Sequence, residues 1–258
     1  MTILFSSLLG AALGSFANVI ILRWHENAPI TGRSRCPKCQ KIIRPRHLVP
    51  VLSWILLRGR CADCGAKIHF QYPIIEAFAA LLAVIAAIRH DPFVDIWPFV
   101  FELVVTIGLL VPVVMDLRWK ELPVEFLLGL GIFAFLFRAI SVSQDPRTFF
   151  STLIGSALAV AGAVIFFYVQ ILVSNGRWLG EGDVWFGGMM GAILGTPLLT
   201  GLALYVSYLC GGVFALVGLC VGALRPKSRI PFAPALAAGT LVALWHGERI
   251  LSWVARAT

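Results

Sequence analysis

Two aspartates stand at the ends of apolar segments, where a carboxylate is costly unless it has a partner or a function. Asp116 closes the apolar run 109–115, and Asp183 comes directly before the apolar segment 184–188. Two carboxyl groups at hydrogen-bonding distance do not both ionise readily, so one keeps a proton while the other acts as a base on water. The pair therefore predicts aspartic-protease chemistry, and Gly180 and Gly182 are expected to let the backbone turn sharply beside Asp183.

A structural role for the two aspartates is the alternative, and the residues alone leave both interpretations open. Each carboxylate can instead cap the helix that follows it or pair with a cation at the membrane interface. Two further acids, Glu76 and Glu181, are expected at the level of the lipid headgroups, and Glu76 is also placed to support the loop that precedes it. The cations available for pairing with the aspartates are Arg118, Lys120 and Arg177.

Four cysteines form two CxxC pairs separated by 21 residues: Cys36, Cys39, Cys61 and Cys64. This spacing lets two short loops present four thiolates to one tetrahedral ion, and it predicts zinc, with an iron–sulfur cluster or a redox pair as alternatives. The role is expected to be structural, because four sulfur ligands leave no open position for water. The remaining cysteines, Cys210 and Cys220, are interpreted as small apolar side chains within a helix.

Long apolar segments must position these residues. The chain has 258 residues, of which 59% are hydrophobic and only 13% are charged, which excludes an ordinary soluble domain. The first apolar run lacks a basic segment before it and is interpreted as a retained span rather than a signal peptide. We therefore predict an all-α polytopic membrane protein with about eight transmembrane helices, near 3–22, 73–89, 97–115, 122–143, 149–173, 184–200, 202–224 and 232–254.

The net positive charge is concentrated in one loop. Residues 23–72 hold ten Lys and Arg against two acids, whereas the rest of the chain holds eleven of each. Short basic loops stay on the cytoplasmic side, so we expect Met1 outside and the breaks at 116–121, 174–183 and 225–229 inside. Anionic lipid headgroups are a plausible partner of this basic loop. No helix-turn-helix pattern accompanies the charge, so nucleic acid is not expected.

These observations predict three parts. Residues 1–22 form the first transmembrane helix, residues 23–72 a small cytoplasmic four-cysteine zinc module, and residues 73–258 a seven-helix membrane domain that carries both aspartates. Zinc is expected to supply much of the module's stability, because its apolar core is small.

Taken together, these features resemble the type IV prepilin peptidase family of bifunctional membrane aspartic proteases, over nearly the whole chain. The resemblance depends on the order and spacing of several short segments rather than on any single one. These are residues 13–23, both CxxC pairs, residues 50–61 and 72–76, Asp116 with Leu122-Pro123, Gly180-Glu-Gly-Asp183, and residues 230–235.

The resemblance implies that Asp116 and Asp183 are the catalytic pair, at the cytoplasmic face of a bacterial inner membrane. It implies cleavage of type IV prepilins or type II secretion pseudopilins after the glycine that ends a basic leader. It also implies methylation of the new N-terminus with S-adenosylmethionine, and no methyl-donor site is readable in the sequence. Gly14, Ser15 and Asn18 belong to a family segment, and they are expected to serve helix packing, with contact to substrate or methyl donor as the alternative.

The chain departs from the family pattern at two positions, because it has Arg118 and Val124 where many members carry further acids. If Arg118 meets Asp116, it favours the ionised form of that carboxylate, and Asp183 then becomes the holder of the shared proton. Two rival functions remain: a transporter with proton-relay carboxylates, and an assembly factor without catalysis. The transporter is disfavoured, since relay acids are expected nearer the middle of a span and no paired half-helices are present.

Overall fold

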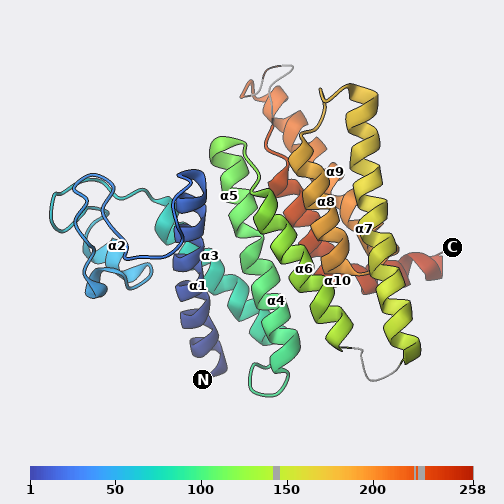
Figure 1. Cartoon of the computed structure of the whole chain (residues 1–258), viewed down its shortest axis with the longest axis horizontal. Coiled ribbons are helices and arrows are strands. Elements are labelled where there is room, and N and C mark those ends of the chain that lie inside the picture. The colour runs from blue at the N-terminus through green and yellow to red at the C-terminus, as the bar shows by residue number, and fades with distance from the viewer. Residues whose placement is uncertain (142–145, 224, 226–229, 258) are drawn as a thin grey trace. The chain divides into compact units, whose positions relative to one another are not determined.

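The computed structural model describes residues 1–141, 146–223, 225 and 230–257, and the part of the chain that it describes is helical without extended strands (Figure 1). Part of the predicted break at 225–229 lies outside these residues. The helices are α1 (Thr2–His25), η1 (Pro45–His47), α2 (Leu52–Leu56), α3 (Gln71–Arg89), α4 (Ile96–Gly108), α5 (Leu110–Trp119), α6 (Val124–Ser141), α7 (Pro146–Ser174), α8 (Glu181–Leu194), α9 (Pro197–Cys220) and α10 (Ala233–Ala257).

Two compact units divide the chain after Val114. The first unit holds α1, the loop module with α2, α3 and α4, and the second holds the end of α5 and helices α6 to α10. The three-part division predicted from membrane topology, at 22/23 and 72/73, stays a prediction. In the structure the loop module is bounded by the end of α1 at His25 and the start of α3 at Gln71.

Among the described residues, six helical segments are long and apolar enough to cross a membrane, which confirms a polytopic membrane protein. The prediction of about eight spans is not settled by these criteria, because neither α8 nor α10 meets them. The predicted span 184–200 is misplaced. Its helix α8 begins at Glu181 and ends at Leu194, where Gly195 adopts a left-handed conformation with a φ of 71°. Pro197 then begins α9.

Close contact between α1 and α3 organises the first unit. A Cβ atom added at Gly14 would lie 2.7 Å from the Cβ of Ala79 and 2.9 Å from the Cα of Glu76. A Cβ at Gly10 would lie 2.5 Å from the backbone oxygen of Ala79. These glycines therefore let two helix backbones touch, as small residues do between membrane helices. The expectation that Gly14 serves helix packing agrees with this contact.

The span that leads to Asp116 has a local irregularity. Helix α4 ends at Gly108 and α5 begins at Leu110, with Leu109 between them in a helical conformation, and the two together form one candidate span. Pro112 explains the irregularity, because proline has no N–H to donate to the carbonyl of Gly108 one turn earlier.

Helix α8 is the buried helix of the second unit, and it packs on α6, α7 and α10. Phe186, Met190 and Ile193 are fully enclosed. Glycines let α7 approach closely, since a Cβ at Gly187 would lie 2.5 Å from the ring of Phe167 and one at Gly191 would lie 2.7 Å from the backbone of Ala159. A helix surrounded by protein need not match the membrane thickness, and α8 has only 14 residues.

The α1–α3 contact predicts that two glycine substitutions differ in their effect on the stability of the protein. Gly14→Ala places a methyl group against helix backbone and is expected to destabilise the protein by about 1–3 kcal/mol. Gly162→Ala is the matched control in α7, because no atom lies within 4 Å of the added Cβ, and alanine favours a helix by up to about 1 kcal/mol. Thermal unfolding of both variants in detergent measures the difference. Equal melting temperatures for the two variants would contradict the contact.

Candidate active site and cysteine centre

Asp116 lies near the end of α5 and contacts the beginning of α10. Its side chain is buried, with 8% of the residue exposed, and its Oδ2 accepts a hydrogen bond of 2.8 Å from the backbone N–H of Ala233. The first N–H groups of a helix have no partner within the helix. Asp116 therefore satisfies one such donor of α10 and lies at the positive end of that helix's dipole.

Asp183 lies in the first turn of α8, and 8% of it is exposed. Its Oδ2 accepts a hydrogen bond of 3.1 Å from the N–H of Gly180, the residue that caps the helix. This is the reciprocal half of a capping box, since glycine has no side chain to complete the other half. The capping role considered from the sequence is thus present for Asp183, which leaves its second oxygen, Oδ1, outside the cap.

The two aspartates approach one another within the second unit. The end of α5 and the beginnings of α8 and α10 lie at the same end of this unit, the upper end in Figure 1. The charge of Asp116 is the smallest of the influences on the pKa of Asp183, and it adds to the rise. The structure therefore places both aspartates at one end of this unit, although the chain separates them by 66 intervening residues, and their role as a catalytic pair stays a prediction.

Gly182 has a different role from the one expected. Sequence analysis predicted that Gly180 and Gly182 make a sharp turn, but Gly180 has an ordinary extended conformation, with φ −86° and ψ 160°, and Gly182 lies within α8. A Cβ at Gly182 would lie 2.8 Å from the Cβ of Leu122. The glycine thus makes room for the loop that follows α5, and this contact holds the ends of α5 and α8 together.

Burial controls the ionisation of Asp183, which lies outside the six candidate membrane spans. Loss of solvent raises the pKa of Asp183 to about 6, the hydrogen bond from Gly180 opposes this rise, and the charge of Asp116 adds to it. At neutral pH a carboxyl group with such a pKa exchanges its proton readily. This property suits a group that must both hold and release a proton during a reaction.

Sequence analysis considered Arg118, Lys120 and Arg177 as partners of the aspartates. Among the described contacts, the guanidinium of Arg118 lies over the ring of Trp119, 4.5 Å from its centroid. The charge that acts on Asp116 comes from Lys120. Arg177, another proposed partner, donates to the carbonyl of Ser174 at 3.0 Å.

Several residues beside the aspartates were not identified from the sequence. Tyr208 of α9 is close enough for the charge of Asp183 to act on its phenol, and its hydroxyl donates to Gln170 of α7 at 2.8 Å. Its ring packs edge to face against Phe166 and against Phe232, with centroids 5.7 Å and 5.2 Å apart. Phe232 immediately precedes the residue that binds Asp116. Residues 230–235 belong to the family resemblance, but nothing in the sequence places Phe232 beside Tyr208.

A further buried acid, Glu102 in α4, was also missed. It is 3% exposed and accepts from Arg89 at 3.0 Å, and His90 lies 3.2 Å from the same oxygen. Its position within the apolar run 96–108 was the available signal. Because its charge is matched by neighbours in the first unit, it has a structural role there.

The four cysteines converge in the loop module. Their sulfur atoms all lie within 4.8 Å of one another. Two similar turns present them: the N–H of Gln40 donates to the carbonyl of Cys36 at 2.8 Å, and the N–H of Gly65 donates to that of Cys61 at 2.9 Å. Both Gln40 and Gly65 have positive φ angles, of 58° and 68°. Each turn is closed by one antiparallel bridge, Arg35 with Ile42 and Arg60 with Lys67.

This geometry fits a tetrahedral metal ion such as zinc. Four sulfurs about 2.3 Å from one ion lie about 3.8 Å from one another, and the sulfurs of Cys36 and Cys64 are 3.8 Å apart. The backbone N–H of Cys39 contributes most to lowering the pKa of Cys36 to about 7, whereas a backbone hydrogen bond is outweighed by burial and the neighbouring cysteines, which raise the pKa of Cys64 to about 11. The sulfur positions rather than the pKa values therefore support a metal ion. Cys210 and Cys220 lie on the exposed surface of α9, apart from this cluster.

Buried polar contacts attach the module to the helices of the first unit. Glu76 of α3 accepts a hydrogen bond of 2.6 Å from the N–H of Val51, directly before α2, which agrees with the expected support of the module. Asn18 of α1 donates to the carbonyl of Tyr72 at 3.2 Å and accepts from Gln71 at 3.3 Å. Asn18 is thus a contact between the end of the module and α1.

The fold and these two clusters define a multi-pass membrane protein with a four-cysteine module and a pair of buried carboxyl groups. Residues 8–90 match the Bacterial Peptidase A24 N-terminal domain, and residues 103–216 match the Type IV leader peptidase family. The chain belongs to this family of peptidases. No solved structure matches it.

Known relatives cover the whole chain. It is 31% identical over 255 residues to a prepilin leader peptidase/N-methyltransferase of Bacillus subtilis, a match that includes 98% of this chain and 97% of the relative. It is 30% identical over 275 residues to a protein of the same name from Pseudomonas aeruginosa, covering 96% and 91% of the two chains. A type 4 prepilin-like proteins leader peptide-processing enzyme of Escherichia coli is 29% identical over 262 residues, 92% of this chain and 91% of the relative.

The raised pKa of Asp183 predicts that this residue costs stability. The unfolded chain releases the Asp183 proton near pH 4, whereas the folded chain holds it until about pH 6. The free energy of unfolding therefore falls by about 3 kcal/mol in total as pH rises from about 4 to about 6. It stays lower at higher pH. Asp183→Asn keeps an oxygen for the Gly180 N–H and cannot ionise. It is expected to be more stable than the native chain above pH 6, and equally stable near pH 4.

Unfolding of the full chain in detergent at a series of pH values checks this expectation. Glu125→Gln, which removes an exposed acid from the first turn of α6, is the control and should follow the native curve. Parallel native and Asp183→Asn curves between pH 4 and pH 7 would show that the burial of Asp183 does not perturb its ionisation.

Proposed function

We propose that this protein is a membrane aspartic endopeptidase that removes the basic leader of type IV prepilins or type II secretion pseudopilins after a glycine, and then methylates the new N-terminus. The observation that carries the proposal is the approach of Asp116 and Asp183, both buried, at one end of the second unit. The names of the relatives from Bacillus subtilis and Pseudomonas aeruginosa support the same two activities.

In the proposed mechanism, Asp116 is the base and Asp183 the acid. Asp116 takes a proton from water as the water oxygen attacks the carbonyl carbon of the scissile bond. Asp183 gives its proton to the carbonyl oxygen, which becomes part of a tetrahedral intermediate. The intermediate then collapses as the C–N bond breaks, the proton on Asp116 passes to the leaving amine, and a hydroxyl proton of the intermediate returns to Asp183. The pKa of about 6 supports Asp183 as the proton holder.

The basic loop supports a cytoplasmic location for the site, in the inner membrane of a bacterium. With residues 23–72 inside and Met1 outside, helix alternation puts the end of α5 and the beginning of α8 on the cytoplasmic side. A prepilin inserted with its basic leader in the cytoplasm then presents its cleavage point at that face. The second activity takes its methyl group from S-adenosylmethionine, which transfers it to the free amine that cleavage creates.

Zinc is proposed as a structural ion held by Cys36, Cys39, Cys61 and Cys64. The sulfur spacing supports zinc, and the small apolar content of the module supports a role in its folding. The family membership favours the peptidase over the transporter and the assembly factor. Relay carboxylates of a transporter are expected nearer the middle of a span, and an assembly factor without catalysis gives no reason for paired carboxyl groups at the end of the bundle.

Asparagine variants test the catalytic pair. Asp116→Asn and Asp183→Asn each keep the shape of the side chain but remove either the base or the acid, so each is expected to reduce prepilin cleavage by about a hundredfold or more. Cleavage is followed by the change in substrate mass in membranes that contain equal amounts of each variant. Glu125→Gln is expected to cleave at the native rate. Undiminished cleavage by either asparagine variant would refute the peptidase proposal.

Metal analysis tests the cysteine centre. The native chain is expected to purify with about one zinc ion, and Cys36→Ser or Cys64→Ser to lose most of it, because a neutral hydroxyl is a poor replacement for a thiolate ligand. Cys210→Ser, which changes an exposed cysteine of α9, should retain the ion. Full zinc content in the Cys36→Ser and Cys64→Ser variants would remove the assignment.

A further inference from the structure

An exposed apolar face marks the short helix α2 of the loop module. Leu52, Ile55 and Leu56 are 52%, 58% and 71% exposed. Their spacing of three and four residues places them on one side of the helix. Val49, directly before this helix, is 46% exposed. A helix of five residues is marginal in water by itself, so an uncovered apolar face on it calls for a partner.

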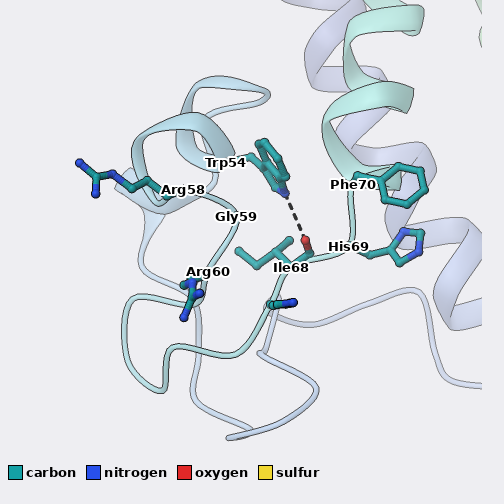
Figure 2. A pocket seen from close by; sticks show the side chains of 8 residues that line it. Trp54, Arg58, Gly59, Arg60, Ile68, His69 and Phe70 are labelled. Atoms are coloured by element: carbon teal, nitrogen blue, oxygen red, sulfur yellow. Dashed lines mark hydrogen bonds between the residues drawn. The ribbon is translucent and has the colours of Figure 1, made fainter.

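A basic and aromatic cleft of about 450 Å³ adjoins the same helix. Trp54 of α2 lines it, and the indole N–H of Trp54 donates to the carbonyl of Ile68 at 3.3 Å. Figure 2 shows Arg58 and Arg60 on one side of Trp54, and His69 and Phe70 on the side where the chain enters α3. Among the described residues, no carboxylate lines this cleft, whose cations are Arg58, Arg60, Lys67 and, when protonated, His69.

The position of the cleft relative to a membrane follows from the chain itself. Phe70 lines the cleft and is 61% exposed, and the next residue, Gln71, begins the candidate span α3. The cleft therefore lies within one residue of the membrane boundary, at the depth of lipid headgroups. Ile74, one turn after Phe70, is also an exposed apolar side chain, with 55% of it accessible. Apolar and basic groups thus meet at one level, as they do in protein segments that lie on anionic membranes.

The positive charge of the cleft distinguishes among three possible ligands: a basic leader peptide, S-adenosylmethionine and a phospholipid headgroup. A basic leader is repelled by three cations with no acid between them. S-adenosylmethionine carries a sulfonium and an ammonium group against a single carboxylate, and the cleft offers no acid for the two positive groups. A phosphodiester headgroup is anionic, and its acyl chains extend toward the apolar face of α2. Only this ligand complements both the cleft and the exposed helix face.

We propose that the loop module docks on the membrane surface by binding anionic phospholipid headgroups between Arg58, Arg60 and Lys67, with Leu52, Ile55 and Leu56 inserted among the acyl chains. This docking is independent of the peptidase chemistry. It fixes the module against the bilayer from which α1 and α3 emerge.

Hydrogen exchange of the full chain in lipid nanodiscs tests the docking. The amides of α2 belong to a single short helix and open readily unless its apolar face is covered. In discs with one third phosphatidylglycerol, exchange over residues 52–58 is expected to be about fivefold slower than in pure phosphatidylcholine discs, because each Lys or Arg near an anionic surface adds attraction. The difference should fade as salt is raised. Equal exchange in the two kinds of disc would overturn the proposal without any variant.

Matched charge variants locate the effect. Arg58→Gln, Arg60→Gln and Lys67→Gln combined should abolish the protection by phosphatidylglycerol. Arg33→Gln, Arg35→Gln and Lys38→Gln combined remove three exposed cations of the same module that do not line the cleft, and should preserve most of it. Zinc content verifies that both variants fold. Equal loss in the two variants would overturn the assignment to the cleft.

Two further outcomes would identify another occupant. Full protection of residues 52–58 in detergent without phospholipid would mean that the protein itself covers α2. Protection produced in detergent by S-adenosylmethionine alone would identify a methyl-donor site. Either result would overturn lipid docking, and neither would affect the test of the peptidase, which depends on the aspartates of the second unit.

Discussion

Two buried carboxyl groups can persist in this apolar bundle because each is placed where a helix begins. Asp116 accepts from the first residue of α10, and Asp183 accepts from the residue that caps α8. A helix start offers unpaired N–H groups and a positive dipole end, which offset part of the cost of removing a carboxylate from water. The offset is incomplete for Asp183, whose pKa remains raised to about 6. The arrangement that holds the pair thus also keeps a proton available between them.

Close helix packing makes this arrangement possible. Helix α8 is short and enclosed, and glycines at its contacts with α7 and with the loop after α5 let backbones approach where side chains would hold them apart. The ring of Phe232 adds a second constraint, because it packs on Tyr208 directly before the residue that binds Asp116. Displacement of α8 or of the start of α10 would therefore separate the carboxyl groups and also remove their hydrogen-bond donors.

The loop module follows a different physical principle. It has few apolar residues to bury, and its order comes from the four converging sulfurs and from polar contacts with α1 and α3. Its charge is concentrated on the outside, where Arg58, Arg60 and Lys67 are exposed. Such a module gains little from a hydrophobic core of its own. The proposed metal ion inside it and the proposed contact with an anionic membrane surface would supply what the core does not.

The sequence by itself determined the class of the protein, the cysteine cluster and the identity of the two aspartates. Long apolar runs, CxxC spacing and acids at the ends of apolar segments are local features. They can be recognised in the sequence without knowledge of the fold. The boundaries of α8 were predicted poorly, because a helix enclosed by other helices carries no signal of membrane length.

Only the tertiary structure decided what surrounds the aspartates. The donor from Ala233, the aromatic contacts of Tyr208 and the role of Gly182 as space for Leu122 all join residues far apart in the chain. Of the cations that the sequence offered, Lys120 acts on Asp116 through its charge, and the guanidinium of Arg118 lies over the ring of Trp119. Residue types and spacing cannot predict such contacts, because they depend on how helix ends meet in space.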